Sequence, residues 1–334
     1  MFRLALFSIL ATGIAATAMG RPIVIAHRGA SGYLPEHTLA AAAYGHAQGA
    51  DYIEQDLVMS RDNVLVVLHD IHLEMTTNVA TVFPGRARDD GRFYAIDFDW
   101  SELKQLHANE RINTTTGEQV YPDRFPLQPG PFRLCSLEEQ IKLIQGLNQS
   151  TGRRVGIQPE LKYPSWHADE GKDLSAALLP ILLRYGFLSP GAPIFVQCFE
   201  ADELRRLRNE FKLEIPLIQL IGLNSWNHAN ANYDAMLTPT GLADIATYAQ
   251  GIGPHIEQVF DHLASTDLPA LTSLSADARA AGLQIHPYTL RADEIPESVT
   301  DFETLMDLFT TTATVDGLFT DHPDLVMKHI TQTD

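Results

Sequence analysis

Short apolar runs bounded by turn-forming residues alternate with stretches of helical periodicity along most of the chain. The runs that are rich in β-branched residues, as buried strands are, cover residues 22–26, 52–58, 155–160, 194–198, 217–221, 250–253, 283–286 and 317–320. Helical patterns cover residues 36–48, 136–148, 173–185, 201–211, 240–248, 272–281 and 301–311. Eight strands that alternate with helices predict an α/β fold, a parallel (β/α)8 TIM barrel.

One further strand-like run, residues 64–68, breaks the alternation. Only Ser60-Arg-Asp-Asn63 separates it from the preceding strand, and a parallel crossover needs a dozen or more residues, so the two runs must form an antiparallel hairpin. Residues 71–134 then pass without a recognisable barrel element. Because structureless loops of this length are rare, we expect residues 71–134 to form a small inserted cap over the barrel mouth, directly after the hairpin.

The first 20 residues have the three-part pattern of a secretory signal peptide. A basic start at Arg3 precedes an apolar run over residues 4–16, and small residues around Ala18 suit cleavage. That run is too short to span a membrane comfortably, and no later stretch reaches the roughly 18 uncharged apolar residues that a spanning helix needs. We therefore expect a cleaved signal peptide over residues 1–20, a mature barrel over residues 21–334, export, and no membrane anchor.

The amino-acid composition excludes some classes of protein. The chain has 24 basic and 42 acidic residues and a net charge of −18, so nucleic acid is not an expected partner, because its phosphate backbone would be repelled. Hydrophobic residues make up 45% of the chain, which is ample for a core and excludes a disordered protein. Cys135 and Cys198 could pair in an oxidising compartment, although a small buried residue is the favoured interpretation for each. The sequence does not indicate an oligomeric state.

Polar residues collect where the expected strands end, the edge that carries the active site in TIM barrels. The first strand runs into His27-Arg28-Gly29. The second carries Glu54-x-Asp56, and side-chain alternation puts both carboxylates on one face of the strand.

Similar signals follow on the next elements. The hairpin strand closes with His69-Asp70, and the third barrel strand closes with Pro159-Glu160-Leu-Lys162. Each motif alone also has a structural interpretation as a turn or a salt-bridged edge, and for His286-Pro and Thr320-Asp321 that interpretation is favoured. The convergence of so many charges on one barrel mouth nevertheless indicates a ligand, because unpaired buried charge is costly.

The residue types indicate the chemistry. Three carboxylates, from Glu54, Asp56 and Glu160, suit a hard cation such as Ca²⁺ or Mg²⁺. Arg28 and Lys162 offer cations for a phosphate, and His27 and His69 form a natural acid/base pair because imidazole titrates near neutral pH. Phosphodiester cleavage fits this set better than glycoside cleavage, which needs two carboxylates and no phosphate clamp.

The same motifs carry a family resemblance. His27-Arg28-Gly29-x5-Pro-Glu-His-Thr38, Glu54-x-Asp56, His69-Asp70, Pro159-Glu160-x-Lys162 and Gly317-Leu-Phe-Thr-Asp321 occur in the order seen in the glycerophosphodiester phosphodiesterase family. The chain resembles this family along nearly its whole mature length. Together with the signal peptide, the long insertion and His286-Pro-Tyr-Thr289 make it similar to the periplasmic bacterial branch. His37 stands where the family often has Asn.

The resemblance implies metal-dependent hydrolysis of glycerophosphodiesters such as glycerophosphocholine and glycerophosphoethanolamine to sn-glycerol 3-phosphate and an alcohol. It assigns Ca²⁺, with Mg²⁺ as the alternative cation, to Glu54, Asp56 and Glu160, acid/base catalysis to His27 and His69, and phosphate binding to Arg28 and Lys162. The insertion would then limit the site to small, water-soluble diesters. Two alternatives are a phospholipase D-like enzyme on intact lipids and a non-catalytic exported binding protein on the same barrel.

Overall fold

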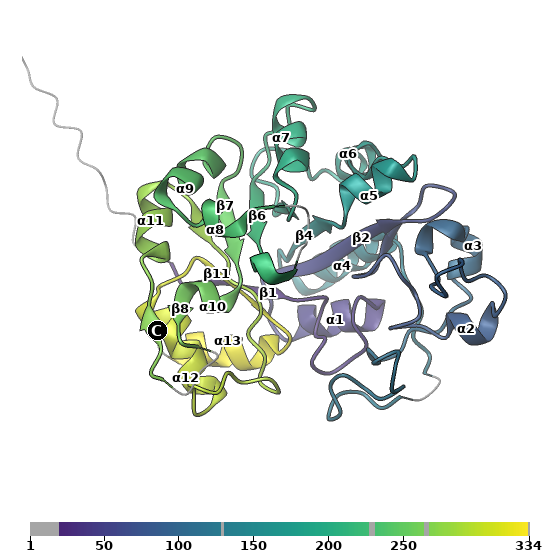
Figure 1. The fold of residues 1–334 in the computed structure, drawn as a ribbon, viewed down its shortest axis with the longest axis horizontal. Coiled ribbons are helices and arrows are strands. Elements are labelled where there is room, and N and C mark those ends of the chain that lie inside the picture. The colour runs from purple at the N-terminus through teal and green to yellow at the C-terminus, as the bar shows by residue number, and fades with distance from the viewer. Residues whose placement is uncertain (1–19, 128–129, 227–230, 264–266, 333–334) are drawn as a thin grey trace, which may run out of the picture.

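Eight parallel strands form the centre of the structure, a computed structural model that describes residues 20–127, 130–226, 231–263 and 267–332 (Figure 1). They are β1 (Ile23–Ala26), β2 (Tyr52–Met59), β4 (Gly156–Leu161), β5 (Val196–Cys198), β6 (Leu217–Ile221), β7 (Gly251–Pro254), β10 (Gln284–Ile285) and β11 (Gly317–Thr320). They lie in the order β10-β7-β6-β5-β4-β2-β1-β11.

Backbone hydrogen bonds bring the two ends of this sheet together. The amide of Asp316 donates to the carbonyl of Ile285 at 3.0 Å, and the amide of Phe319, on β11, donates to the carbonyl of Pro287 at 3.1 Å. The sheet is thereby a nearly closed parallel barrel, and the predicted TIM-barrel fold is confirmed.

Helices follow the strands as the sequence predicted, and their ends are set by local caps. They are α1 (Leu39–Ala47), α4 (Leu137–Thr151), α6 (Leu174–Arg184), α7 (Ala201–Asn209), α9 (Pro239–Ile245), α11 (Leu274–Ala280) and α12 (Phe302–Asp307), which the π-helical turn η3 (Leu308–Thr312) extends. Ser136 and Glu139 form the capping box that starts α4. Helix α1 starts later than expected, because the Thr38 hydroxyl accepts the Ala41 amide hydrogen at 3.1 Å.

The sequence analysis missed the short elements and the last helix. These are α5 (Pro164–Asp169), η2 (Asn224–Trp226), α8 (Tyr233–Met236), α10 (Ile256–Val259), the hairpin of β8 (Phe260–Asp261) with β9 (Ala270–Leu271), and α13 (Pro323–Gln332). Most are too short to show a period of 3.6 residues. Helix α13 packs against β1 and buries Val326 and Ile330.

The predicted hairpin is present: β3 (Leu65–Val67) pairs antiparallel with β2. The insertion that follows contains α2 (Val79–Val82), η1 (Ala95–Asp97) and α3 (Trp100–Leu103), and α2 and α3 lie to one side of the barrel (Figure 1). It has an apolar cluster of its own, formed by Leu73, Val79, Phe93, Ala95, Phe98, Leu103, Leu106 and Leu134 with Val58, Val66 and Leu68 of the hairpin. The insertion is therefore folded against the hairpin rather than structureless.

The expected signal peptide lies, except for Gly20, outside the described residues. Within the described part of the chain, no helix combines the length and the apolar character needed to cross a bilayer. Cys135 and Cys198 are buried free thiols. Each donates to a backbone carbonyl, of His37 at 3.1 Å and of Leu161 at 3.3 Å respectively, so neither takes part in a disulfide.

The buried side chain of His286 predicts how stability depends on pH. It is 1% exposed, its Nδ1 atom has no hydrogen-bond partner in the described structure, and burial lowers its pKa to about 3. Between pH 6.5, the ordinary pKa of imidazole, and pH 3 the unfolded chain therefore binds a proton that the folded chain does not. The free energy of unfolding should fall as the pH is lowered through this window.

We expect His286→Gln to reduce that pH dependence by up to about 1.4 kcal/mol per pH unit. Urea denaturation of the parent and the variant at several pH values measures it, and the difference in slope is informative even if the variant is less stable at every pH. Equal slopes in the two proteins would contradict the prediction.

Candidate active site

A cavity of about 310 Å³ lies at the carboxyl ends of the barrel strands. All of the residues singled out from the sequence line it, namely His27, Arg28, Glu54, Asp56, His69, Glu160 and Lys162. Tyr163, Phe199, Trp226, Tyr288 and Phe319 add an aromatic wall. The structure thus brings the predicted site residues together in one place.

The loop after β1 is so tightly folded that it requires a glycine at position 29. Arg28 and Gly29 have φ angles of 58° and 85°, in the left-handed region. A Cβ atom on Gly29 would lie 2.6 Å from the backbone of Ala41, at the start of α1. Because of this turn, the backbone amide of Arg28 donates to Glu54 Oε2 at 2.7 Å.

Strand alternation and register place the acidic groups. Glu54 and Asp56 face the cavity from β2, while Ile53 and Leu57, which flank the pair along the strand, belong to the apolar core. The register of β2 and β4 sets Asp56 beside Glu160. The three carboxylates are 1%, 1% and 6% exposed, so they are held almost out of contact with solvent.

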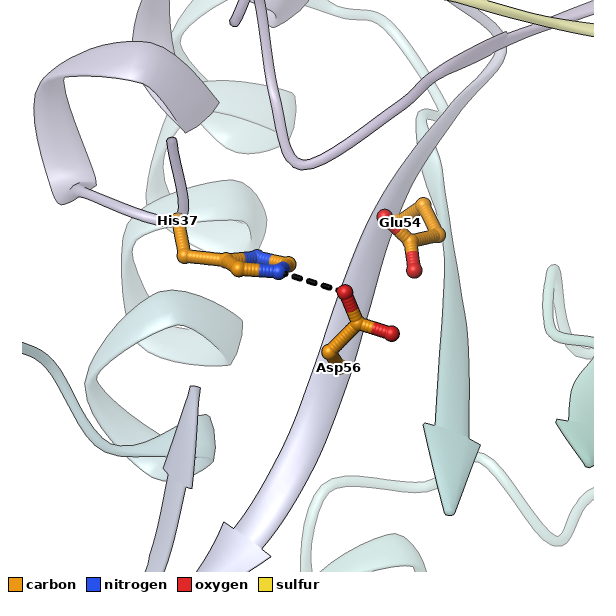
Figure 2. A group of neighbouring side chains, drawn as sticks. All are labelled: His37, Glu54 and Asp56. Carbon is orange, nitrogen blue, oxygen red and sulfur yellow. Dashed lines mark hydrogen bonds and ion pairs between the residues drawn. The ribbon is translucent and has the colours of Figure 1, made fainter. Parts of the chain in front are cut away.

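His37 joins this acidic group, which the sequence analysis did not foresee (Figure 2). Its Nε2 atom lies 2.7 Å from Asp56 Oδ2, and ligand atoms of His37, Glu54 and Asp56 all lie within 4.8 Å of one another. Two of the three predicted ligands, Glu54 and Asp56, therefore belong to a group that could hold a metal ion. Glu160 instead forms an ion pair with Lys162 Nζ at 2.7 Å.

The electrostatics of the acidic group fit a cation. Burial raises the pKa of Glu54 well above its usual value, and the negative charges of Asp56 and Glu160 add to the effect. Burial likewise raises the pKa of Glu160 to about 8. Asp56 Oδ1 is buried and accepts no hydrogen bond within the described structure. A divalent cation would relieve this repulsion and use that oxygen, which lies 3.6 Å from Lys162 Nζ.

Each of the two predicted acid/base histidines is held by a carboxylate. His27 Nδ1 lies 2.6 Å from Asp321 Oδ1, and His69 Nδ1 lies 2.9 Å from Asp70 Oδ1. Despite their burial, the pKa of each aspartate is held well below its usual value by nearby positive groups, so both are ionised and only accept. Nδ1 must therefore carry the proton in each ring, which leaves Nε2 as the basic nitrogen.

Burial and neighbouring cations keep both imidazoles neutral. The pKa of His27 falls to about 4 and that of His69 to about 3, mainly because the rings are removed from water and partly because Arg28 is close. A phosphodiester anion bound beside the rings would favour their protonated form. The pair can then supply one base and one acid.

Arg28 is held in place by acidic groups on both sides. Its Nη1 atom donates to both oxygens of Glu36, at 3.2 and 3.1 Å, and its Nε atom lies 3.6 Å from Asp56 Oδ2. Arg111 of the insertion binds the same Glu36 carboxylate. The guanidinium of Arg28 is therefore pre-positioned at the cavity wall.

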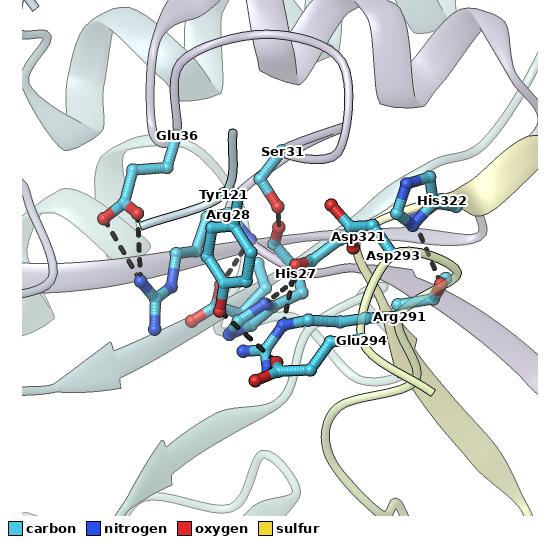
Figure 3. A network of polar contacts seen from close by, with 12 residues as sticks. His27, Arg28, Ser31, Glu36, Tyr121, Arg291, Asp293, Glu294, Asp321 and His322 are labelled. Atoms are coloured by element: carbon cyan, nitrogen blue, oxygen red, sulfur yellow. Dashed lines mark hydrogen bonds and ion pairs between the residues drawn. The ribbon is translucent and has the colours of Figure 1, made fainter. Parts of the chain in front are cut away.

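A smaller cavity of about 190 Å³ adjoins the first, with which it shares the two histidines. Arg111, Tyr121 and Arg124 of the insertion line it together with Ser31, Glu36, Arg291 and Asp321, and His27, Arg28 and His69 are common to both cavities. Figure 3 shows Asp321 between His27 and Arg291. The guanidinium of Arg124 lies 3.7 Å from the centre of the Tyr121 ring. The sequence analysis gave no role to Arg111, Tyr121, Arg124 or Arg291, and for Asp321 it favoured a structural one.

A TIM barrel whose mouth combines buried carboxylates, paired imidazoles and buried cations belongs to the class of barrel hydrolases that act on phosphate esters. The profile of the glycerophosphoryl diester phosphodiesterase family matches residues 27–325. The chain belongs to that family, and it is an enzyme, a phosphoric diester hydrolase.

Curated relatives bear the same activity in their names. A glycerophosphodiester phosphodiesterase of Haemophilus influenzae is 41% identical over 90% of this chain and 88% of its own length. One of Treponema pallidum is 36% identical over 97% of this chain and 95% of its own length.

Solved structures show the same fold at lower identity. A glycerophosphoryl diester phosphodiesterase structure from Silicibacter pomeroyi is 23% identical, with a TM-score of 0.69 and coverage of 94% of both chains. A phosphodiesterase from Oleispira antarctica, solved in complex with the product sn-glycerol-3-phosphate, is 22% identical, with a TM-score of 0.63 over 93% of this chain and 97% of its own.

Proposed function

We propose that this enzyme hydrolyses small glycerophosphodiesters, such as glycerophosphocholine and glycerophosphoethanolamine, to sn-glycerol 3-phosphate and an alcohol. The observation that carries the proposal is the pair of carboxylate-held imidazoles, His27 and His69, which line two adjoining cavities. A diester has a substituent on each side of its phosphorus. Two cavities that meet at the acid/base pair would receive one substituent each.

The cationic side chains and the two imidazoles would have different roles in the reaction. Arg28 and Lys162 would bind the phosphoryl oxygens, Arg28 through its planar fork. One imidazole would take the proton of the attacking hydroxyl or water at Nε2, while the other would give a proton to the oxygen of the departing alcohol. The side chains of His27 and His69 are only 12% and 26% exposed, and the reduced contact with solvent strengthens these interactions.

The cation that we propose is Ca²⁺, with Mg²⁺ as the alternative. Glu54 and Asp56 would hold it together with Glu160, and His37 would position Asp56 through its hydrogen bond. When bound, such an ion stabilises negative charge on the phosphate. The three proposed ligands offer only carboxylate oxygens, which suit Ca²⁺ or Mg²⁺, and neither cysteine of the chain lies in the group.

One assay tests the proposed function directly. Release of sn-glycerol 3-phosphate from glycerophosphocholine, followed by a coupled dehydrogenase, should require divalent cation and produce choline in equal amount. Phosphocholine as the product would mean that the other ester bond is cleaved. Preference for intact phosphatidylcholine vesicles would favour the phospholipase D-like alternative.

Arg28→Lys should be far from conservative. A lysine keeps the positive charge but loses the fork that can bind two phosphate oxygens and both oxygens of Glu36. We expect kcat/KM to fall by about 10-fold or more, the value of roughly one charge-assisted hydrogen bond. Steady-state kinetics on glycerophosphocholine measure it, and kinetics identical to the parent's would leave Lys162 as the main phosphate ligand.

We further propose that residues 71–134 act as a cap that limits the site to small diesters, and that residues 1–20 direct export to the periplasm. The cap proposal is supported by Arg111, Tyr121 and Arg124, which reach the second cavity from the insertion.

The export proposal for residues 1–20 is supported by the signal-peptide pattern alone. Processing at residue 20 can be checked by mass spectrometry of the protein recovered from a periplasmic extract.

A further inference from the structure

Two arginines of the insertion each contact the carboxylate behind one of the paired histidines. Arg111 Nη1 donates to Asp70 Oδ2 at 2.6 Å, while Asp70 Oδ1 faces His69. Arg124 Nη2 donates to Asp321 Oδ2 at 2.7 Å, while Asp321 Oδ1 faces His27. The same arrangement of histidine, aspartate and arginine therefore occurs twice in the site.

Both arginines are fixed at their other ends. Arg111, whose side chain is 12% exposed, donates from Nη2 and Nε to the two oxygens of Glu36 at 2.6 and 3.1 Å. Arg124, whose side chain is 5% exposed, binds Asp293 with two hydrogen bonds of 2.7 and 3.0 Å. Each guanidinium thus joins two carboxylates in a fixed plane.

We propose that Arg111 and Arg124 are positioning residues, through which the insertion holds the two histidine–aspartate pairs in their working geometry. This inference rests on the acid/base roles proposed above for His27 and His69. It assigns the insertion a part in the chemical step, in addition to any part in substrate selection.

Each arginine would keep its aspartate both ionised and correctly oriented. Each aspartate must stay ionised to accept the Nδ1 hydrogen, and it must not rotate, because its rotation would carry the imidazole with it. A guanidinium on the second carboxylate oxygen meets both needs. A displacement of about 1 Å at a reacting group can cost about 10²-fold in rate.

We expect the substitution of Arg111 and the substitution of Arg124 to have different effects on the kinetics. Asp321 also accepts from Arg291 Nε at 2.8 Å, so it keeps one guanidinium when Arg124 is removed. Asp70 has Arg111 as its guanidinium partner, and Glu36, which Arg111 binds, also holds the phosphate-facing Arg28. Arg111→Ala should therefore be the more damaging substitution and should affect KM as well as kcat.

The test compares Arg124→Ala, Arg124→Lys, Arg111→Ala and the control Arg88→Ala in the full-length, metal-loaded enzyme. Arg88 is a matched control, because it lies in the same insertion and binds two carboxylates, Asp97 and Glu170, that do not touch either histidine. We expect about a 10-fold loss of kcat at unchanged KM in Arg124→Ala, partial recovery in Arg124→Lys, about a 10²-fold loss in Arg111→Ala, and parent kinetics in the control.

A second readout does not depend on turnover. Nitrogen chemical shifts of labelled histidine should show one fixed tautomer for His27 in the parent and a mixture in Arg124→Ala. An unchanged kcat and tautomer in folded Arg124→Ala would overturn the inference, as would a rise in KM at unchanged kcat, which would mean direct substrate binding. If the parent releases no glycerol 3-phosphate, the proposed function fails instead, and the tautomer measurement still decides the positioning role.

Discussion

EDTA should abolish hydrolysis of glycerophosphocholine and lower the melting temperature, and added Ca²⁺ should restore both. Glu54, Asp56 and Glu160 are buried together. Burial raises the pKa values of Glu54 and Glu160, and the negative charge of Asp56 adds to the repulsion at both. A bound cation removes that repulsion only in the folded state, so it also stabilises the fold. Activity assays and thermal melts of the chelated and reloaded protein measure the two effects.

Glu54→Gln should prevent the restoration by Ca²⁺, because the amide cannot replace a charged ligand. The matched control is Glu303→Gln on α12, which neutralises an exposed carboxylate of the same kind. The control should respond to EDTA and Ca²⁺ as the parent does. Full activity of exhaustively dialysed parent enzyme would exclude a metal in the mechanism.

His27→Ala and His69→Ala should each lower kcat by about 10²–10⁴-fold, the usual contribution of a positioned proton donor or acceptor. The fold should survive, since both side chains line cavities rather than the apolar core. His262→Ala, which truncates an exposed histidine on the β8–β9 hairpin side of the barrel, serves as the control. Near-normal turnover in both site variants would show that the acid and base lie elsewhere.

The residues that the sequence could identify are those whose position follows from a strand. Glu54 and Asp56 share a face because side chains alternate along β2, and Glu160 and Lys162 stand where β4 ends. The order of strands in a TIM barrel then brings these ends together without further information. For this reason the barrel and the predicted site residues could be inferred before any coordinates.

The residues that the sequence could not identify are placed by loops. His37 reaches Asp56 only because the chain between Arg28 and Thr38 turns through left-handed conformations, and short-range patterns do not predict such turns. Arg111 and Arg124 lie in an insertion whose elements are too short to show a period. Asp321 meets His27 across 294 residues of sequence, a distance over which no local rule applies.

The pairing of β1 with β11 also bears on how the chain folds. The first strand of the barrel completes its hydrogen bonding with the last, from Ile23 with Gly317 to Ala26 with Thr320. Contacts between such distant segments are formed late and slowly, because a very long loop must close before they contribute stability. The barrel therefore cannot close until residues 317–320 have been synthesised. A protein that closes its first strand with its last stays open while it is being made, which is the state that the export proposed for residues 1–20 would require.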